Sequence, residues 1–313
     1  MTHVENDPCL KEAIRDLTRH IAHLKSERNI PGCCVGIVHD RELIWNEAFG
    51  LADHSKGIPV SPHTGFKIAS LTKLFTASLL MILRQDGLLN LDDPLSKYVS
   101  SVRVENPFPD PQPLSFRQVA SHMSGLPNDL DEDSLAKLRC SNYKEFLQAT
   151  QSCELASPPM TEYRYSNLGY VLLGHVLSKV AGKPFRKLIK ERIFIPLGME
   201  ETSFEKKDLK EENLAIGYLC EKQSGGSENM GGRNLATAQH FDTGIWASAG
   251  GLYSSVIDLS RFLSWQLYQG PRTLDRPLGG LALREMHAPV AVEENWSGGA
   301  SIGWRSGSIG GFS

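Results

Sequence analysis

The sequence predicts an α+β fold in which an antiparallel sheet is flanked by helices and joined to a mostly helical lobe. Residues 33–45 indicate a β-hairpin, because two apolar runs are separated by a short polar turn. Residues 66–268 have a largely helical pattern, and residues 296–313 are rich in Gly and Ser, as strand ends beside a cleft are. Sheet segments at both ends of the chain, with a helical block between them, favour this fold class.

The N-terminal elements follow from the spacing of apolar residues. A helix is predicted over residues 9–28, where apolar side chains recur at spacings of three and four: Leu10, Ile14, Leu17, Ile21 and Leu24. The first strand of the hairpin, residues 33–38, is apolar throughout. We therefore expect it in the middle of a sheet with both faces covered.

The helical block begins with a strong helix from Ser70 to Gln85, which Gly87 is placed to terminate. The same apolar spacing predicts further helices at residues 114–121, 143–150, 168–181, 184–193 and 257–268. The connections between them are rich in Pro, Asp, Gly and Ser, as loops are.

The composition is that of a globular protein without a strong net charge. Its 313 residues carry 33 basic and 36 acidic side chains, for a formal net charge of −3 at pH 7. There is no basic excess and no Lys/Arg-rich run, so nucleic acid is not expected as a partner. The longest apolar runs, such as residues 79–83, are far shorter than the roughly 18 residues of a membrane span. The first residues lack the basic and apolar regions of a secretory signal, which predicts a cytoplasmic protein.

Ser70 and Lys73 form the first candidate catalytic pair. Lys73 lies three residues after Ser70 on a predicted helix, so both side chains share one face. Lysine accepts a serine proton only when neutral, and lowering its pKa from about 10.4 to near 7 takes roughly 4–5 kcal/mol. A helix dipole supplies at most about 2 kcal/mol, so we expect Lys73 in a dry cleft or beside a second cation. An N-cap serine followed by a surface lysine has the same spacing, so the pair alone is a weak signal.

Tyr165 and Asn167 form a second candidate group, just before a predicted helix. The Tyr-x-Asn spacing places a phenol and an amide on the same side of an extended segment. A phenol beside Lys73 is suited to passing a proton, and an amide to holding a substrate carbonyl. An aromatic contact together with an Asn N-cap is the alternative interpretation.

Arg305, Ser306, Gly307 and Ser308 form a third candidate group, in the Gly-rich segment near the end of the chain. Backbone N–H groups at a strand edge are suited to an oxyanion hole, and Arg305 is suited to binding a substrate carboxylate. A flexible loop is the alternative interpretation of this segment.

In this order, the three groups resemble the motifs of the serine β-lactamase and penicillin-binding protein superfamily. The Tyr-x-Asn form is similar to its class C β-lactamase and family VIII esterase branch. Further stretches match in family order, and the resemblance covers nearly the whole chain: residues 89–98, 121–127, 170–174, 194–199 and 251–255.

The resemblance implies a β-lactamase/transpeptidase-like fold, with residues 1–313 as a single catalytic unit. An α/β lobe would comprise residues 1–61 and 287–313, and a mostly helical lobe residues 62–286. The implied function is that of a serine hydrolase that cleaves small acyl esters or amides, with no cofactor and no metal.

The resemblance also assigns roles to the candidate residues. Ser70 is implied to be the nucleophile that forms an acyl-enzyme, and Lys73 with Tyr165 to activate it and protonate the leaving group. Asn167 is implied to contact the substrate, and the backbone N–H groups of Ser70 and Ser308 to form the oxyanion hole.

Two features depart from the family pattern. Arg305 stands where the family has Lys or His, and arginine binds an anion but does not shuttle a proton. It directly follows residues 302–304, where relatives have an intervening strand and turn, and the sequence stops at Ser313, where relatives continue through two strands and a helix. We therefore expect an incomplete sheet with an unpaired edge on the N-terminal hairpin. A catalytically impaired or non-catalytic truncated relative, acting as a binding or regulatory chain, is the alternative function.

Several activities share these residues. The lack of a secretory signal favours an esterase over a β-lactamase or a D-amino-acid peptidase, because cell-wall substrates and most β-lactams lie outside the cytosol. An acyltransferase, in which an alcohol or amine replaces water, uses the same residues. The sequence leaves the acyl group and the oligomeric state open.

Overall fold

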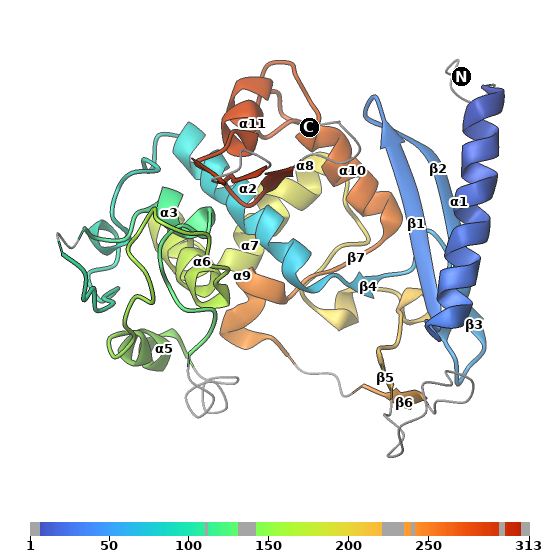
Figure 1. Ribbon diagram of the computed structural model, residues 1–313, viewed down its shortest axis with the longest axis horizontal. Helices are drawn as coiled ribbons and strands as arrows, with labels where there is room; N and C mark the ends of the chain where they lie inside the picture. Colours follow the sequence, from blue (N-terminus) through green and yellow to red (C-terminus); the bar gives the residue numbers. More distant parts are fainter. Residues whose placement is uncertain are drawn as a thin grey trace. The chain divides into compact units, whose positions relative to one another are not determined.

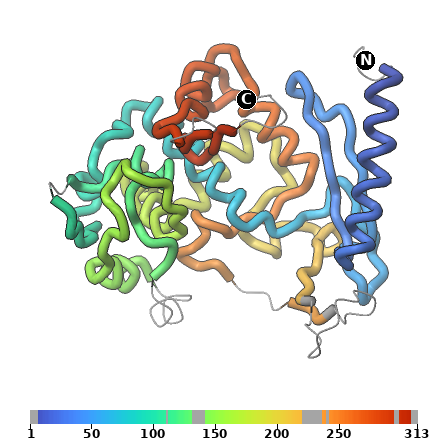
Figure 2. The backbone as a smooth tube through the Cα atoms, in the orientation of Figure 1, coloured from blue at the N-terminus to red at the C-terminus, as the bar shows by residue number. Residues whose placement is uncertain are grey.

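The computed structural model describes residues 7–109, 112–130, 142–220, 235–238, 242–293 and 298–307. The chain divides into two compact units; Figure 1 labels most of their elements, and Figure 2 traces the backbone. Unit 1 comprises Met1–Lys67, Met199–Phe241 and Tyr253–Leu267, and unit 2 comprises Ile68–Gly198, Asp242–Leu252 and Tyr268–Ser313.

The elements of unit 1 are α1 (Pro8–Glu27), β1 (Gly32–His39), β2 (Glu42–Asp53), β3 (Ile58–Pro59), β4 (Phe66–Lys67), β5 (Tyr218–Cys220), β6 (Leu235–Thr237), β7 (Tyr253–Ser254) and α10 (Val256–Gln266). Those of unit 2 are α2 (Thr72–Gln85), α3 (Phe116–Ala120), α5 (Tyr143–Thr150), α6 (Asn167–Ala181), α7 (Phe185–Ile189), α8 (Ile195–Leu197), α9 (Ala247–Gly250), α11 (Gly280–His287), β8 (Ala291–Val292), β9 (Gly298–Ala300) and β10 (Arg305–Gly307). Helices accompany small antiparallel sheets, so the predicted α+β class is confirmed.

β1 and β2 form the antiparallel hairpin that the sequence predicts. Asp40 and Arg41 at its tip have φ angles of +46° and +70°, as the two central residues of a type I′ turn do. Directly opposed residues share a face of a sheet and successive residues alternate between faces. Val35 of β1 is paired with Glu47 of β2, and the Glu47 carboxylate accepts a hydrogen bond from Thr18 of α1 (2.6 Å). The next residue along β1, Gly36, lies against Val256 of α10. α1 and α10 therefore cover opposite faces of the hairpin.

The prediction that residues 33–38 form a central strand is wrong for the described part of the chain. The strand order is β1-β2-β3, so β2 is in the middle and β1 is at an edge. The residues of β1 are half-buried or exposed, because helices cover its faces while no described strand pairs with its outer side. The apolar composition of β1 indicates that its faces are covered, but it does not indicate which strands lie next to it.

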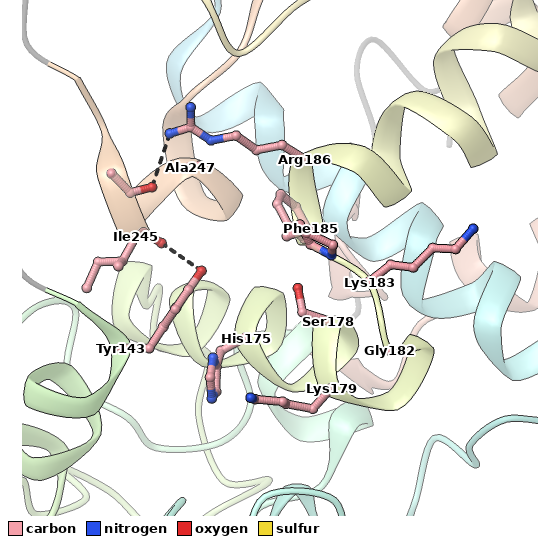
Figure 3. A pocket seen from close by; sticks show the side chains of 12 residues that line it. Tyr143, His175, Ser178, Lys179, Gly182, Lys183, Phe185, Arg186, Ile245 and Ala247 are labelled. Atoms are coloured by element: carbon pink, nitrogen blue, oxygen red, sulfur yellow. Dashed lines mark hydrogen bonds between the residues drawn. The ribbon is translucent and has the colours of Figure 1, made fainter.

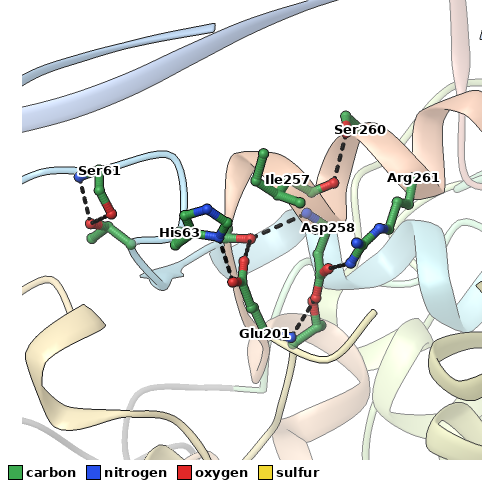
Figure 4. A network of polar contacts seen from close by, with 10 residues as sticks. Ser61, His63, Glu201, Ile257, Asp258, Ser260 and Arg261 are labelled. Atoms are coloured by element: carbon green, nitrogen blue, oxygen red, sulfur yellow. Dashed lines mark hydrogen bonds and ion pairs between the residues drawn. The ribbon is translucent and has the colours of Figure 1, made fainter. Parts of the chain in front are cut away.

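A polar network around Asp258 joins three segments of unit 1 (Figure 4). The Asp258 carboxylate is fully buried and accepts from the backbone N–H of Glu201 (2.7 Å), the hydroxyl of Thr202 (2.8 Å) and the guanidinium of Arg261 (2.7 Å). Burial raises the pKa of Asp258, and these three donors counter that effect by favouring the carboxylate. Glu201 also contacts His63, with 2.6 Å between Oε1 and Nδ1. The network thus fastens the start of α10 to two distant loops.

α2 and α6 form the buried centre of unit 2, and α9 packs against both. Gly174 of α6 permits the close approach of α9, because a Cβ atom there would lie 2.4 Å from Cβ of Ser248. Thr76 of α2 donates its hydroxyl hydrogen to the carbonyl of Ser248 (2.7 Å). These two contacts set the position of α9, which the candidate site uses.

β8, β9 and β10 form a three-stranded antiparallel sheet within unit 2. Just before β10, the backbone N–H groups of Ile302 and Gly303 donate to the carbonyls of Met286 (3.1 Å) and Ala120 (3.0 Å). These bonds explain why residues 268–313 group with the helical unit, whereas the predicted lobes place residues 287–313 with residues 1–61. The division into those two lobes stays a prediction.

The helices predicted between residues 70 and 268 are present, with shifted ends. α2 begins at Thr72 because Ala69–Leu71 forms a 3₁₀ turn, and α7 continues into a π-helical segment at Lys190–Phe194. α10 begins one residue after Ser255, whose hydroxyl accepts from the backbone N–H of Asp258 (3.2 Å) as an N-cap. Among the described helices, none combines the length and the apolarity that crossing a membrane requires.

Candidate active site

Ser70 lies in a tight turn at the start of α2. It is the middle residue of the 3₁₀ turn Ala69–Leu71, in which Ala69 has a φ of +45°. This left-handed conformation costs a residue with a Cβ atom about 1–2 kcal/mol. Thr72 supports the turn, because its hydroxyl donates to the carbonyl of Ala69 (2.6 Å) and accepts from the backbone N–H of Leu252 (3.1 Å). Ser70 is therefore held exposed at the beginning of the helix, as the sequence predicts.

Lys73 lies one turn further along α2, with three oxygen atoms around its ammonium group. Nζ donates to Oγ of Ser70 (3.3 Å), to Oδ1 of Asn167 (2.7 Å) and to the backbone carbonyl of Ala249 (2.7 Å). Lys73 is only 4 % exposed. α2, α6 and α9 each contribute to this arrangement, so the structure brings together Ser70, Lys73 and Asn167. The carbonyl of Ala249 carries no signal in the sequence, because any residue type offers one.

Burial lowers the pKa of Lys73 to about 8. The nearby carboxylate of Asp129 acts in the opposite direction and raises this pKa. Among the described residues, no second cation lowers the pKa of Lys73. Burial, and then the charge of Lys73, lower the pKa of His122 to about 3, so His122 is neutral near pH 7. Of the two causes that the sequence left open, desolvation in a dry site is the one found.

Tyr165 lies beside both Ser70 and Lys73. The Ser70 hydroxyl lies close enough to lower the pKa of Tyr165, and Nζ of Lys73 lies 4.8 Å from the centroid of the Tyr165 ring. Burial is the largest of the effects that together raise the pKa of Tyr165, so its phenol keeps its proton near neutral pH. The structure thus joins Tyr165 to the predicted pair.

Asn167, the first residue of α6, connects Lys73 to the loop that follows α3. Its Oδ1 accepts from Lys73, while its Nδ2 donates to Oδ1 of Asn128 (3.2 Å) and to Oδ2 of Asp129 (3.3 Å). Because the amide nitrogen faces the loop, the amide oxygen is fixed toward the ammonium group. Asp129 was missed at the sequence level, since an acidic residue in a polar loop carries no distinguishing pattern.

His122 packs its ring against the ring of Tyr165. Its ring lies 4.6 Å from the ring of Tyr165 and 5.0 Å from that of the buried Tyr170, measured between centroids. Its Nδ1 accepts from the backbone N–H of Ser166 (3.0 Å), and its φ of +60° is a left-handed conformation. His122 belongs to residues 121–127, one of the stretches that match the family pattern, and the structure places its ring against that of Tyr165.

Arg305, in β10, contacts a carboxylate and an aromatic ring. Its guanidinium forms an ion pair with Glu293 and lies 4.5 Å from the centroid of the Tyr163 ring. The Tyr163 ring in turn lies 5.6 Å from that of His122. Arg305 is thus connected to the Ser70 cluster through two aromatic rings, and among the described residues no hydrogen bond or ion pair joins it to Ser70 directly.

The other residues of the third group lie along β10. Ser306 and Gly307 are exposed and pair with Gly299 and Gly298 of β9, and Oγ of Ser306 donates to the carbonyl of Gly299 (3.4 Å). Ser308 lies outside the described residues, so its role in an oxyanion hole stays a prediction.

Comparison with known proteins gives matches that cover most of the chain. The family model described as "Beta-lactamase" matches residues 17–311. Beta-lactamase-like protein 2 of Dictyostelium discoideum is 29 % identical over 294 residues, which cover 92 % of this chain and 51 % of that protein. Protein flp of Staphylococcus aureus (strain COL) is 29 % identical over 248 residues, covering 79 % of this chain and 47 % of that protein. The chain thus spans about half the length of these curated relatives.

Solved structures share the fold. An octameric penicillin-binding protein homologue from Pyrococcus abyssi has a TM-score of 0.78 at 27 % identity. The match covers 93 % of this chain and 64 % of that one. A class C β-lactamase from Rhodobacter sphaeroides has a TM-score of 0.73 at 22 % identity, covering 92 % of this chain and 74 % of that one. EstCE1, described as a hydrolase with promiscuous acyltransferase activity, has a TM-score of 0.76 at 20 % identity, covering 96 % of this chain and 84 % of that one. The last two matches show the fold alone, and the expected β-lactamase/transpeptidase-like fold is confirmed.

Proposed function

Because the chain belongs to the Beta-lactamase family, we propose that it is a serine hydrolase that cleaves small acyl esters or amides through an acyl-enzyme on Ser70. The observation that carries the proposal is the buried Lys73, whose Nζ lies 3.3 Å from Oγ of Ser70. With a pKa of about 8, about one lysine in ten is neutral at pH 7, against about one in three thousand at the ordinary value. Burial thus makes Lys73 a general base that functions near neutral pH.

The geometry supports a division of roles between Lys73 and Tyr165. As Oγ of Ser70 bonds to the substrate carbonyl carbon, Lys73 takes the hydroxyl proton. Tyr165 holds its own proton, so it donates that proton to the leaving oxygen or nitrogen as the carbon–leaving-group bond breaks, and it regains a proton from Lys73. Deacylation reverses these steps, with water in place of the leaving group. Water attacks the carbonyl carbon of acyl-Ser70 and gives its proton through Tyr165 to Lys73, and Lys73 returns a proton to Oγ as its bond to the acyl carbon breaks. The carboxylic acid is released and the serine is restored.

The contact between Arg305 and Glu293 supports an esterase that prefers neutral acyl groups. Both residues line a cavity of about 420 Å³, together with Tyr163. A substrate that carries a carboxylate, as β-lactams and D-alanyl peptides do, would have to displace Glu293 from Arg305 before binding there. A neutral ester requires no such displacement. An acyltransferase uses the same acyl-enzyme, and EstCE1 is described as having such activity.

Labelling by a fluorophosphonate probe tests the proposal. We expect the probe to label the full chain and the Ser152→Ala control, in which an exposed turn serine is changed, and to leave the Ser70→Ala variant unlabelled. A panel of p-nitrophenyl acyl esters, a chromogenic cephalosporin and a D-alanyl peptide then ranks the substrates, and added alcohol reveals acyl transfer as a new ester. A folded, cooperatively unfolding chain that is not labelled would contradict the proposal and favour the non-catalytic alternative.

The pH dependence of kcat/KM should report the ionisation of Lys73. The rate is expected to rise with pH and to level off, with a midpoint at about 8, because only neutral lysine accepts the serine proton. The Asp129→Asn variant should move this midpoint to lower pH, since the Asp129 carboxylate raises the pKa of Lys73. The Asp92→Asn variant is the matched control, as Asp92 pairs with Arg117 on the surface. A midpoint that is the same in all three proteins would exclude Lys73 as the titrating base.

The Glu293→Gln variant should gain activity toward anionic substrates. Removing the carboxylate frees Arg305, so kcat/KM for an ester with a free carboxylate in its acyl group is expected to rise about threefold, the effect of one partly exposed ion pair. The value for a neutral ester should stay unchanged. Glu162→Gln is the control, because Glu162 lines the same cavity but pairs with Arg164. Equal changes for both esters would show that Arg305 does not contact the acyl group.

A further inference from the structure

Unit 2 contains a second cavity, of about 700 Å³, whose lining includes no residue of the Ser70 cluster. α5, the second half of α6, the start of α7 and the segment that leads into α9 surround it (Figure 3). Sites for small molecules typically enclose about 300–1,000 Å³. The cavity is therefore large enough for a small-molecule ligand.

One part of the lining is apolar and aromatic. Phe185, Ile245 and Ala247 are buried, with exposures between 3 % and 7 %. The rings of Tyr143 and His175 are in tilted contact, with 4.3 Å between centroids and 35° between planes. Burial lowers the pKa of His175 and thereby favours its uncharged form. This part of the cavity offers an uncharged surface to the apolar body of a ligand.

The rim is positively charged. Lys179, Lys183 and Arg186 line the cavity, and its described lining includes no Asp or Glu, although the chain as a whole has a net charge of −3. Figure 3 shows Lys179 beside His175, with Arg186 across the cavity. The rim therefore favours an anion.

The ion pairs of the rim indicate how much positive charge remains there for a ligand to balance. Lys183 pairs with Glu191 (2.8 Å) and Arg186 with Asp242 (3.2 Å). Within the described residues, Lys179 has no carboxylate partner. One added negative charge balances this lysine.

We propose that this cavity binds an amphiphilic carboxylate, with its apolar chain against Phe185 and Ile245 and its carboxylate at Lys179. The site is separate from the proposed catalytic one, although Ala247 of its wall lies two residues from Ala249, whose carbonyl accepts from Lys73. Binding is therefore measured directly and does not depend on the chemistry of Ser70.

The proposal is tested by titrating octanoate into the full chain carrying Ser70→Ala. Binding is measured by calorimetry and by the fluorescence of Trp246, which lies in the sequence between the lining residues Ile245 and Ala247. We expect saturable binding with a dissociation constant below about 1 mM, and binding of the neutral 1-octanol about tenfold weaker. Lys179→Met should weaken octanoate binding about fivefold, because it keeps the aliphatic stem but removes the charge. The control Lys187→Met should have no effect, since Lys187 is exposed, pairs with Glu191 and does not line the cavity.

A second variant, Ser178→Leu, fills the cavity from α6 and should abolish octanoate binding. Thermal unfolding of each variant verifies that it is folded. The proposal is overturned if octanol binds as tightly as octanoate, or if no saturable binding occurs up to about 10 mM. Octanoate binding that neither Lys179→Met nor Ser178→Leu changes would place the ligand elsewhere and would also overturn it.

Discussion

The Lys73→Met variant is expected to acylate Ser70 about 10²–10⁴-fold more slowly than the unchanged chain, because it loses the contribution of a general base. Methionine keeps the volume of the side chain but cannot accept the proton of Ser70. The Lys97→Met variant is the control, since Lys97 is an exposed lysine that pairs with Asp93. Single-turnover acylation by an activated ester measures the effect. A rate close to that of the control would exclude Lys73 as the base.

This variant should remain folded. In the native protein the pKa of Lys73 is about 8 against 10.5 for an ordinary lysine, which corresponds to about 3 kcal/mol of destabilisation. The sign follows from the lowered pKa: the penalty is fully present below pH 8 and disappears as the pH rises toward 10.5. Methionine removes this penalty but leaves the oxygens of Asn167 and Ala249 without their donor, at about 1–3 kcal/mol each. The two effects nearly offset each other, so we expect a melting temperature within a few degrees of the unchanged chain at pH 7.

The Tyr165→Phe variant should lose about a hundredfold or more of its turnover, the contribution of a general acid. Phenylalanine keeps the stacking on His122 and the contact of the ring with Lys73, so folding should be intact. Steady-state hydrolysis of esters with leaving groups of different basicity separates the roles, because a missing acid slows poor leaving groups most.

Tyr163→Phe is the matched control for this experiment. Tyr163 also contacts His122, but the cation beside its ring is Arg305 rather than Lys73. Near-normal turnover of Tyr165→Phe, with every leaving group, would remove Tyr165 from the proton relay.

Much of the fold is predictable because helices and hairpins depend on local spacing. The apolar periods of α1, α2, α5, α6 and α10 place these helices to within a few residues. The position of β1 is not predictable in this way. An apolar strand indicates covered faces, and here α1 and α10 cover them, but neighbouring strands are chosen by contacts between segments that are far apart in sequence.

The environment of the site is harder to predict than its members. Ser70, Lys73, Tyr165 and Asn167 belong to short motifs, whose residues the sequence singles out. Asp129 lies in a loop that has no periodic pattern, and it affects the pKa of Lys73 because the fold brings this loop close to Lys73, with Asn167 bonded to both residues. The occupation of Arg305 by Glu293 likewise depends on the pairing of strands rather than on either residue type.

The sequence by itself determined that Ser70 and Lys73 face each other, because residues three apart share a face in an α-helix and in a 3₁₀ turn alike, whatever surrounds them. Only the tertiary structure decided that this lysine has the pKa of a base. The two strong acceptors of its ammonium group lie 94 and 176 residues away along the chain. Desolvation requires neighbours on every side of a charged group, and a single helix supplies neighbours on one side only.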